Sequence, residues 1–412
     1  MVENYEAKLK EYAALLVHMG VHLRPGQTLF LQATVECADL ARLCAEEAYA
    51  AGAREVDTVF SDNAIARMKY LHAADEVFDT MPDWSAAHYE QLRQSGAAKL
   101  SLIGEDPELL RGVDVGRIQR WNRAVGVGLE AYYRDLTANR FEWSLGGYAT
   151  AAWARKVFPE LPEAEAVDRL WDAVFAAARV EGDGRAAERW EQHIATLAHR
   201  TEWLNARQFR FLHYQNALGT DLTVELPEGH YWAGGAEHTP AGNRFVANIP
   251  TEEVFTLPLR TGVNGVVFAS KPLVLHGQIV DGIRFTFRDG KIAEASAAQG
   301  EEALRKAVAT DEGAAYLGEV ALVPTASPIS ESGILFYNTL FDENAACHLA
   351  FGEAYPCIRG AEAMTDEELK ARGVNYSCMH EDFMVGTPDL SITGVTRDGT
   401  EIAVFRNGNF AF

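Results

Sequence analysis

Several side chains that could bind a divalent metal stand in apolar stretches of the second half of this chain. A solitary charge flanked by hydrophobic residues is costly to bury unless it is paired or bound to a cation, so several such charges predict a shared metal site. Carboxylate oxygens combined with imidazole nitrogens suit catalytic divalent metals. The candidate ligands are Glu253, Glu319, His348, His380 and Asp382.

His380 and Asp382 form the strongest local pair. Residues two apart in an extended segment project to the same side and can reach one metal. Glu252 and Glu381, which adjoin candidate ligands, should then point to the opposite face, and we leave both out of the site. The helical zinc-protease motif with two histidines is absent here, because its second histidine is replaced by Met384.

Each candidate has a simpler interpretation when it is taken alone. Glu253 is then a surface residue of a strand, and His348 is a core histidine whose hydrogen bonds are satisfied. The combination is more informative, because the number of carboxylates and imidazoles is about the number of protein ligands that two divalent ions need when one carboxylate bridges them. Such a metal pair polarises a carbonyl group and supplies hydroxide near neutral pH.

The first half of the chain predicts an open α/β domain. Its expected strands are residues 28–33, 55–60 and 98–103, and its expected helices are residues 5–19, 37–51 and 84–94. Strands and helices that alternate in this way form a parallel sheet with helical crossovers. The turn after the first strand has no glycine cluster, which argues against nucleotide binding. Residues 112–199 should be mainly helical.

The second half of the chain is β-rich. Its expected strands are residues 209–214, 221–226, 265–269 and 282–288. Asp-Gly turns within 288–291 and 396–400 predict β-hairpins, and 301–308 predicts a helix between strands. We therefore predict an α/β domain with a helical extension at 1–204 and a β-rich (α+β) catalytic, metal-binding domain at 205–412.

Composition restricts the possible partners. The chain of 412 residues is 48% hydrophobic, enough for a substantial core, and its net charge of −22 would repel nucleic acid and anionic membranes. The first residues include acids and no apolar run, so we expect neither a secretion signal nor a membrane span and place the protein in the cytoplasm. Five cysteines without a Cys-x-x-Cys pair are typical of reduced thiols.

Four longer segments carry the candidate ligands, and together they resemble the aminopeptidase T and aminopeptidase S family of metallo-aminopeptidases, often called thermophilic aminopeptidases. The resemblance covers the whole chain. The segments are NIPTEEVFT at 248–256, YLGEVALVP at 316–324, FDENAACHLAFGEAY at 341–355 and NYSCMHEDFMVG at 375–386.

The resemblance implies hydrolysis of the first peptide bond of peptides that have a free amino terminus. It also implies a homodimer and two divalent ions per subunit, such as zinc, cobalt or magnesium. Glu319 would bridge the two ions, and Glu343 and Tyr355 match positions near them. The family's metal ligands fall on Glu253, Glu319, His348, His380 and Asp382.

Several roles stay open at this point. Glu343 could be a metal ligand, a proton shuttle or a residue that orients His348. Either Glu319 or Glu343 could relay a proton to the leaving amine. Tyr355 could donate a hydrogen bond to the developing oxyanion, or it could be a buried phenol that anchors a turn. We treat Asp342 and Glu353 as solvated or structural.

Two alternative functions also fit the ligand set. The first is a different dinuclear hydrolase, such as an amidase or a phosphoesterase, because two metals also stabilise phosphoryl displacement. The acidic composition and the lack of an arginine cluster near the ligands disfavour a phosphate substrate. The other is a non-catalytic peptide-binding protein whose metals staple the β-rich domain. Structural metal sites are closed by four protein ligands, so a metal open to water would count against this alternative.

Overall fold

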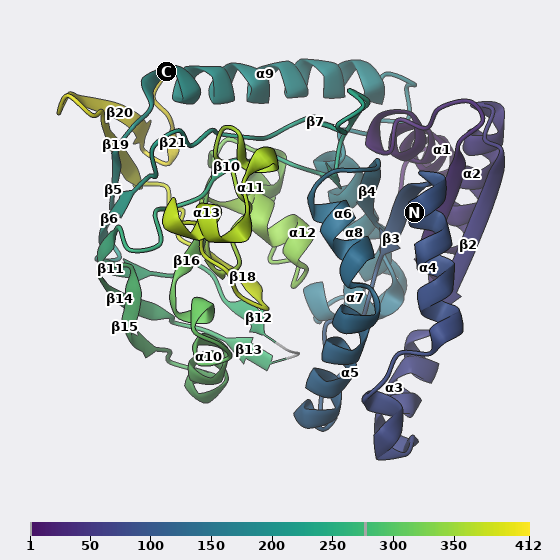
Figure 1. Cartoon of the computed structure of the whole chain (residues 1–412). Helices are drawn as coiled ribbons and strands as arrows, with labels where there is room; N and C mark the ends of the chain where they lie inside the picture. Colours follow the sequence, from purple (N-terminus) through teal and green to yellow (C-terminus); the bar gives the residue numbers. More distant parts are fainter. Residues whose placement is uncertain (1, 276–277) are drawn as a thin grey trace. The chain divides into compact units, whose positions relative to one another are not determined.

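The protein, seen in a computed structural model that describes residues 2–275 and 278–412, has two compact units (Figure 1). Unit 1 extends to Gln192 and also includes Ala236–Pro250, and unit 2 comprises His193–Gly235 and Thr251–Phe412. The predicted boundary separates an α/β domain at 1–204 from a β-rich catalytic domain at 205–412. It stays a prediction, which expression of residues 205–412 alone would test.

Unit 1 is built on a five-stranded parallel sheet with the strand order β2-β1-β3-β4-β9. The strands are β1 (Thr28–Thr34), β2 (Glu55–Ser61), β3 (Ala98–Ile103), β4 (Trp143–Gly147) and β9 (Asn248–Ile249). This confirms the predicted open parallel α/β architecture. Strand β4 was not predicted, because it lies within the segment that we expected to be mainly helical.

The helices of unit 1 follow the expected alternation with strands. They are α1 (Tyr5–Leu15) with a π-helical turn at Leu16–Gly20, α2 (Ala38–Ala50), α3 (Asn63–His72), α4 (Asp83–Ser95), α5 (Val115–Gly128), α6 (Glu130–Thr137), α7 (Ala151–Val157) and α8 (Glu163–Ala177). A small hairpin joins β7 (Glu237–His238) to β8 (Arg244–Phe245). The chain passes from unit 1 to unit 2 within α9 (Ala186–Arg207).

Unit 2 contains an eight-stranded antiparallel sheet with the strand order β15-β14-β11-β6-β5-β19-β20-β21 (Figure 1). The strands are β5 (Phe211–Gln215), β6 (Asp221–Glu225), β11 (Val263–Phe268), β14 (Arg284–Arg288), β15 (Lys291–Ser296), β19 (Ser391–Val395), β20 (Glu401–Arg406) and β21 (Asn409–Phe410). Both predicted hairpins are present, β14–β15 and β19–β20. Asp289 and Gly290 have φ values of 49° and 82°, as a tight hairpin turn requires.

A second, four-stranded antiparallel sheet lies in unit 2 and has the order β10-β16-β17-β18. Its strands are β10 (Val254–Thr256), β16 (Leu317–Leu322), β17 (His348–Gly352) and β18 (His380–Met384). One face contributes Val320, Leu349 and Phe383 to the hydrophobic core that also contains Leu222 and Phe285 of the eight-stranded sheet. Side chains alternate along a strand, so the other face carries the remaining residues.

Shorter elements complete unit 2. They are β12 (Leu273–Leu275), β13 (Gln278–Val280), α10 (Glu301–Val308), α11 (Pro328–Ser332), α12 (Thr339–Asp342), a 3₁₀ turn at Glu343–Ala345 and α13 (Asp366–Ala371). The bounds of α10 match the predicted helix. Within the part of the chain that the structure describes, no helix is both long and apolar enough to cross a membrane. All five cysteines lie in this part and none forms a disulfide.

Candidate metal centre

The register of the four-stranded sheet brings four of the predicted ligands to one face. Glu319 in β16 is opposite Ala350 in β17, and Ala350 is opposite Asp382 in β18. His348 and His380 are two residues from Ala350 and Asp382 along the same strands, so they share this face. Ala350 has only a methyl group between Glu319 and Asp382, which leaves space above β17 for their carboxylates.

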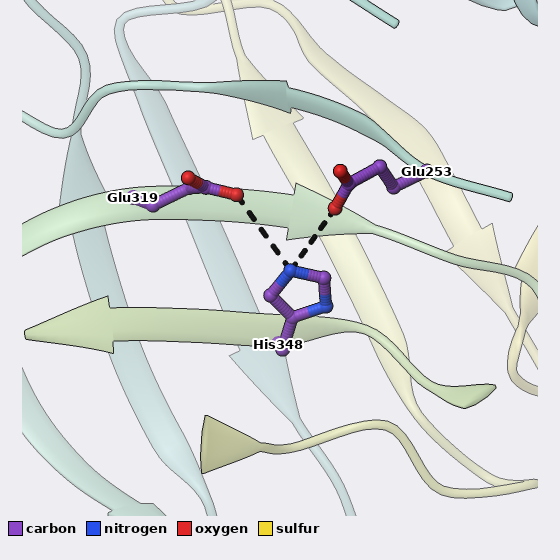
Figure 2. A group of neighbouring side chains, drawn as sticks. All are labelled: Glu253, Glu319 and His348. Atoms are coloured by element: carbon purple, nitrogen blue, oxygen red, sulfur yellow. Dashed lines mark ion pairs between the residues drawn. The ribbon is translucent and has the colours of Figure 1, made fainter. Parts of the chain in front are cut away.

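Glu253 reaches the same place from outside the ladder, because it directly precedes β10. Its Oε2 is 3.1 Å from Nε2 of His348, and Oε1 of Glu319 is 3.6 Å from the same nitrogen. Figure 2 shows both carboxylates pointing toward the His348 ring. Around His380, Nε2 is 3.5 Å from Oε2 of Glu319 and 3.5 Å from Oδ1 of Asp382.

Backbone carbonyls orient both imidazoles. Nδ1 of His348 is 3.1 Å from the carbonyl oxygen of Ala346, and Nδ1 of His380 is 2.7 Å from that of Glu353. A ring whose Nδ1 donates to a carbonyl presents Nε2 as its metal-binding atom. Both Nε2 atoms face carboxylates, so each ring has the orientation that a ligand needs.

A glycine in β16 allows the Glu353 carbonyl to reach His380. The register of β16 and β17 shifts between Leu317 and Glu319, which places Gly318 against the backbone of Glu353. A Cβ atom on Gly318 would lie 2.1 Å from the Glu353 carbonyl oxygen. No side chain larger than hydrogen fits there without displacing the group that orients His380.

The charges of the site change the pKa values of its members. Burial disfavours the imidazolium of His348, but the carboxylates of Glu253 and Glu319 outweigh burial and raise its pKa well above the ordinary value. The pKa of His380 is raised to about 10, because Asp382 and Glu319 outweigh burial there. Burial raises the pKa of Glu319, whereas the two histidines lower that of Asp382 in spite of its burial. Metal binding at Nε2 must therefore displace protons.

The donor set fits a divalent cation. Oε2 of Glu253 and Oδ1 of Asp382 are buried and accept no hydrogen bond, although each lies within 4.0 Å of Nε2 of His348. A buried carboxylate oxygen without a donor is unfavourable unless a cation binds it. Glu253, Glu319 and His348 each place one ligand atom within 4.8 Å of the others.

Glu343 and Tyr355 lie at the edge of this cluster. Burial, followed by the charges of Glu253 and Asp382, raises the pKa of Glu343 well above its ordinary value. The ring of Tyr355 is edge-on to His380, with 5.9 Å between the ring centroids. Tyr355 as a whole residue is 41% exposed, which favours a position at the accessible edge of the cluster over that of a buried anchor. Burial of its hydroxyl and the nearby carboxylates raise its pKa.

The neighbouring acids lie outside the cluster, and for Glu381, which is within β18, this follows from the alternation of side chains. Glu252 is buried, and its Oε2 is 3.7 Å from Nε2 of His193 on α9. Glu381 is opposite Phe351, whose side chain belongs to the core face of the sheet. Asp342 is structural, because its carboxylate accepts hydrogen bonds from the backbone of Phe336 at 2.8 Å and of Asn338 at 3.0 Å. The carboxylate of Glu353 accepts a hydrogen bond from the backbone of Ser377.

Sequence reasoning missed Asn344. This residue is fully buried beside Glu343, and its Oδ1 accepts a hydrogen bond from the backbone nitrogen of Glu252 at 2.7 Å. Its position between Glu343 and His348 in one of the family-like segments was the available signal. The type and spacing of residues near Asn344 do not reveal that its partner is Glu252, which is distant in the sequence.

The chain is similar to known proteins over its whole length. A family model described as thermophilic metalloprotease (M29) matches residues 5–410. Aminopeptidase 2 of Geobacillus stearothermophilus is 47% identical over 412 residues, covering 100% of this chain and 99% of that protein. Aminopeptidase AmpS of Bacillus subtilis (strain 168) is 44% identical and covers 100% of both. The solved structure of wild-type AmpT from Thermus thermophilus matches with a TM-score of 0.92 at 40% identity, covering 99% of this chain and 100% of that one.

Proposed function

The chain belongs to the family of thermophilic metalloproteases (M29). We propose that it is an aminopeptidase that uses two divalent metal ions to remove the first residue of peptides. The observation that carries the proposal is the position of Glu319. Its Oε1 faces His348 and its Oε2 faces His380, at 3.6 Å and 3.5 Å. A carboxylate placed between two imidazoles in this way is suited to bridge two metals.

The proposed ligands divide into two groups around Glu319. Glu253 and His348 lie on one side, and His380 and Asp382 on the other. When bound, the ions would hold the substrate's terminal amine, polarise the scissile carbonyl and lower the pKa of a water molecule to near neutrality. The mixture of oxygen and nitrogen ligands suits zinc, cobalt or magnesium.

The chain's own residues would orient the substrate and move protons. The carboxylates of the cluster attract the terminal ammonium of the peptide, which must give up its proton before its nitrogen can bind a metal. This attraction brings the first peptide bond next to Glu319 and Glu343. Glu343 has a raised pKa because it is buried among other carboxylates. A carboxyl group that can hold a proton near neutral pH is suited to deliver one to the leaving amine, and we assign this role to Glu343.

Tyr355 is placed to stabilise the developing oxyanion. A phenol is already protonated at neutral pH with its ordinary pKa of about 10, and the raised pKa of Tyr355 extends this to higher pH, so the hydroxyl can act as a hydrogen-bond donor. Its ring packs against His380 and also against Phe255, with 6.1 Å between the centroids of the latter pair. These contacts hold the phenol at the accessible edge of the metal centre, where a substrate carbonyl would lie.

Hydrolysis of leucine p-nitroanilide tests the proposal. The purified protein is assayed as prepared, after chelation, and after zinc, cobalt or magnesium is added back, with N-acetyl-leucine p-nitroanilide as the control substrate. We expect metal-dependent cleavage of the substrate with the free amine alone. Metal analysis of the active protein should give two ions per chain, and one ion per chain would overturn the two-metal part of the proposal.

The alternative functions predict different results. Cleavage of the acetylated substrate as well would indicate a less selective amidase, and cleavage of p-nitrophenyl phosphate would indicate a phosphoesterase. A protein that binds metal and peptide but cleaves none of these substrates would be a binding protein.

A homodimer and a cytoplasmic location are parts of the same proposal. Helix α3 supports the dimer, because it has no buried residue and exposes Ile65, Met68 and Leu71 along its length. Apolar side chains gathered on an exposed helix are typical of an interaction surface. Sedimentation equilibrium tests this part, and a monomer at micromolar concentration would overturn it.

A further inference from the structure

Two of the six carboxylates and histidines of the proposed site lie outside the strands of the sheet. Four are held by the hydrogen-bonded ladder of β16, β17 and β18. Glu253 precedes the first paired residue of β10, Val254, and Glu343 begins a 3₁₀ turn. The positions of these two carboxylates therefore depend on contacts that the sheet does not supply.

Asn344 contacts the segments of both off-sheet carboxylates, Glu253 and Glu343. Its Oδ1 accepts a hydrogen bond from the backbone nitrogen of Glu252 at 2.7 Å, directly before Glu253. Its Nδ2 donates to the carbonyl oxygen of Leu340 at 2.8 Å and to Oε1 of Glu343 at 3.4 Å. Asn344 is 0% exposed, so water does not compete for these bonds.

A second side chain holds the segment before Glu253 from another direction. Nε2 of His193, on α9, is 2.7 Å from the carbonyl oxygen of Thr251. Residues 251–253 are therefore fixed by two side chain-to-backbone contacts, one from Asn344 and one from His193. Asn344 also contacts Glu343 directly.

We propose that Asn344 is a positioning residue that holds Glu253 and Glu343 in fixed relation to each other and so completes the off-sheet half of the metal site. The inference rests on the proposed function, in which Glu253 is a metal ligand and Glu343 delivers a proton beside it. Residues that orient ligands without touching the metal commonly contribute about 10- to 100-fold to metal affinity or activity. We expect Asn344 to act within this range.

The test compares Asn344→Ala with the matched variant Asn216→Ala. Asn216 lies in the turn between β5 and β6 of the same unit, and its Oδ1 accepts hydrogen bonds from the backbone nitrogens of Leu218 and Thr220. Both variants therefore lose an asparagine whose side chain accepts hydrogen bonds from the backbone, but Asn344 is the one linked to Glu253 and Glu343 of the proposed site. Affinity for Zn²⁺ and Co²⁺ is measured on chelator-treated full-length protein by competition with a chromogenic chelator, and Tm is measured on the same samples.

The expected result separates positioning from general stability. N344A should bind metal about 10- to 100-fold more weakly than the wild type. N216A should bind metal like the wild type, even if its Tm falls by as much as the Tm of N344A. Equal metal affinity of N344A and wild type would overturn the inference. Absence of metal binding by the wild type would instead overturn the proposed function.

A second variant keeps the inference testable if N344A does not fold. His193→Leu removes the other contact to residues 251–253 from a side chain that is 8% exposed. H193L should also weaken metal binding, but by a smaller factor than N344A, because Glu343 keeps its contact with Asn344. Unchanged metal affinity of H193L would show that the position of residues 251–253 does not limit the site.

Discussion

Glu319 and His380 lie in strands that are not neighbours, and yet Oε2 of Glu319 is 3.5 Å from Nε2 of His380. Strand β17 separates them and places Ala350 opposite Glu319 and Gly352 opposite His380. A larger side chain there would keep the two groups apart. The other oxygen of Glu319 faces His348, so one carboxylate connects the two imidazoles.

Replacement of Glu319 by glutamine should abolish most activity. Glutamine keeps the size of the side chain and removes the charge that a bridging ligand needs. We expect kcat/KM for leucine p-nitroanilide to fall by more than the roughly 100-fold that loss of an orienting residue can cost, and we expect fewer metal ions per chain.

Glu381→Gln is the matched control for this change. Glu381 is next to Asp382 but lies on the other face of β18, and burial raises its pKa to about 7. The control should keep metal content and kcat/KM close to wild type. If E319Q were as active as E381Q, Glu319 would not bridge the metals.

Tyr355→Phe should lower kcat more than it changes KM. The hydroxyl would contact the substrate oxygen mainly in the transition state, and removal of one such donor costs about 10²- to 10³-fold in kcat. Stability should change little, because Tyr355 is 41% exposed. Tyr133→Phe in unit 1 is an equally exposed control. A rise in KM at constant kcat would assign Tyr355 to substrate binding alone.

Much of the fold could be predicted because its signals are local. Alternating apolar residues and Asp-Gly turns indicated the hairpins of unit 2, and they do not depend on distant contacts. Strand β4 lacked such a signal, because Gly146 and Gly147 are typical of turns. A Cβ on Gly146 would lie 2.6 Å from the side chain of Leu16, so the glycine is required by close packing that the sequence does not reveal.

The candidate site divides in the same way. The shared direction of His380 and Asp382 follows from the period of a strand and could be predicted. The approach of Glu253 to His348 could not, because it depends on a segment outside the ladder and on the hydrogen bond from Glu252 to Asn344. Resemblance to a family supplied the ligand set without supplying these contacts. The ligand roles themselves remain predictions.

Acid should destabilise the protein partly through His230. Its ring is buried, and burial, followed by the charges of Arg397 and Arg359, lowers its pKa to about 4. Between the unfolded pKa of about 6.5 and the folded value of about 4, the unfolded chain binds a proton that the native state excludes. The free energy of unfolding should therefore fall as pH decreases through this window, by on the order of 3 kcal/mol from this group.

Urea unfolding of wild type and His230→Gln with excess chelator checks this prediction. Glutamine can donate to the carbonyl oxygen of Pro227, which Nδ1 of His230 approaches at 2.9 Å, but it does not titrate. The wild type should lose stability relative to H230Q only below about pH 6.5. Parallel pH profiles of the two proteins would show that His230 titrates normally.

Gly318→Ala should damage the metal centre through the backbone. The added Cβ would lie 2.1 Å from the carbonyl oxygen of Glu353, and this carbonyl orients Nδ1 of His380. Movement of Glu353 should rotate His380 and weaken metal binding by about 10-fold or more, as for other orienting groups. Gly126→Ala in α5 is the control, because a Cβ there meets nothing within 4 Å and alanine favours a helix by about 1 kcal/mol. G126A should keep wild-type metal affinity with equal or greater stability.

If G318A bound metal as tightly as G126A, the Glu353 carbonyl would not set the orientation of His380.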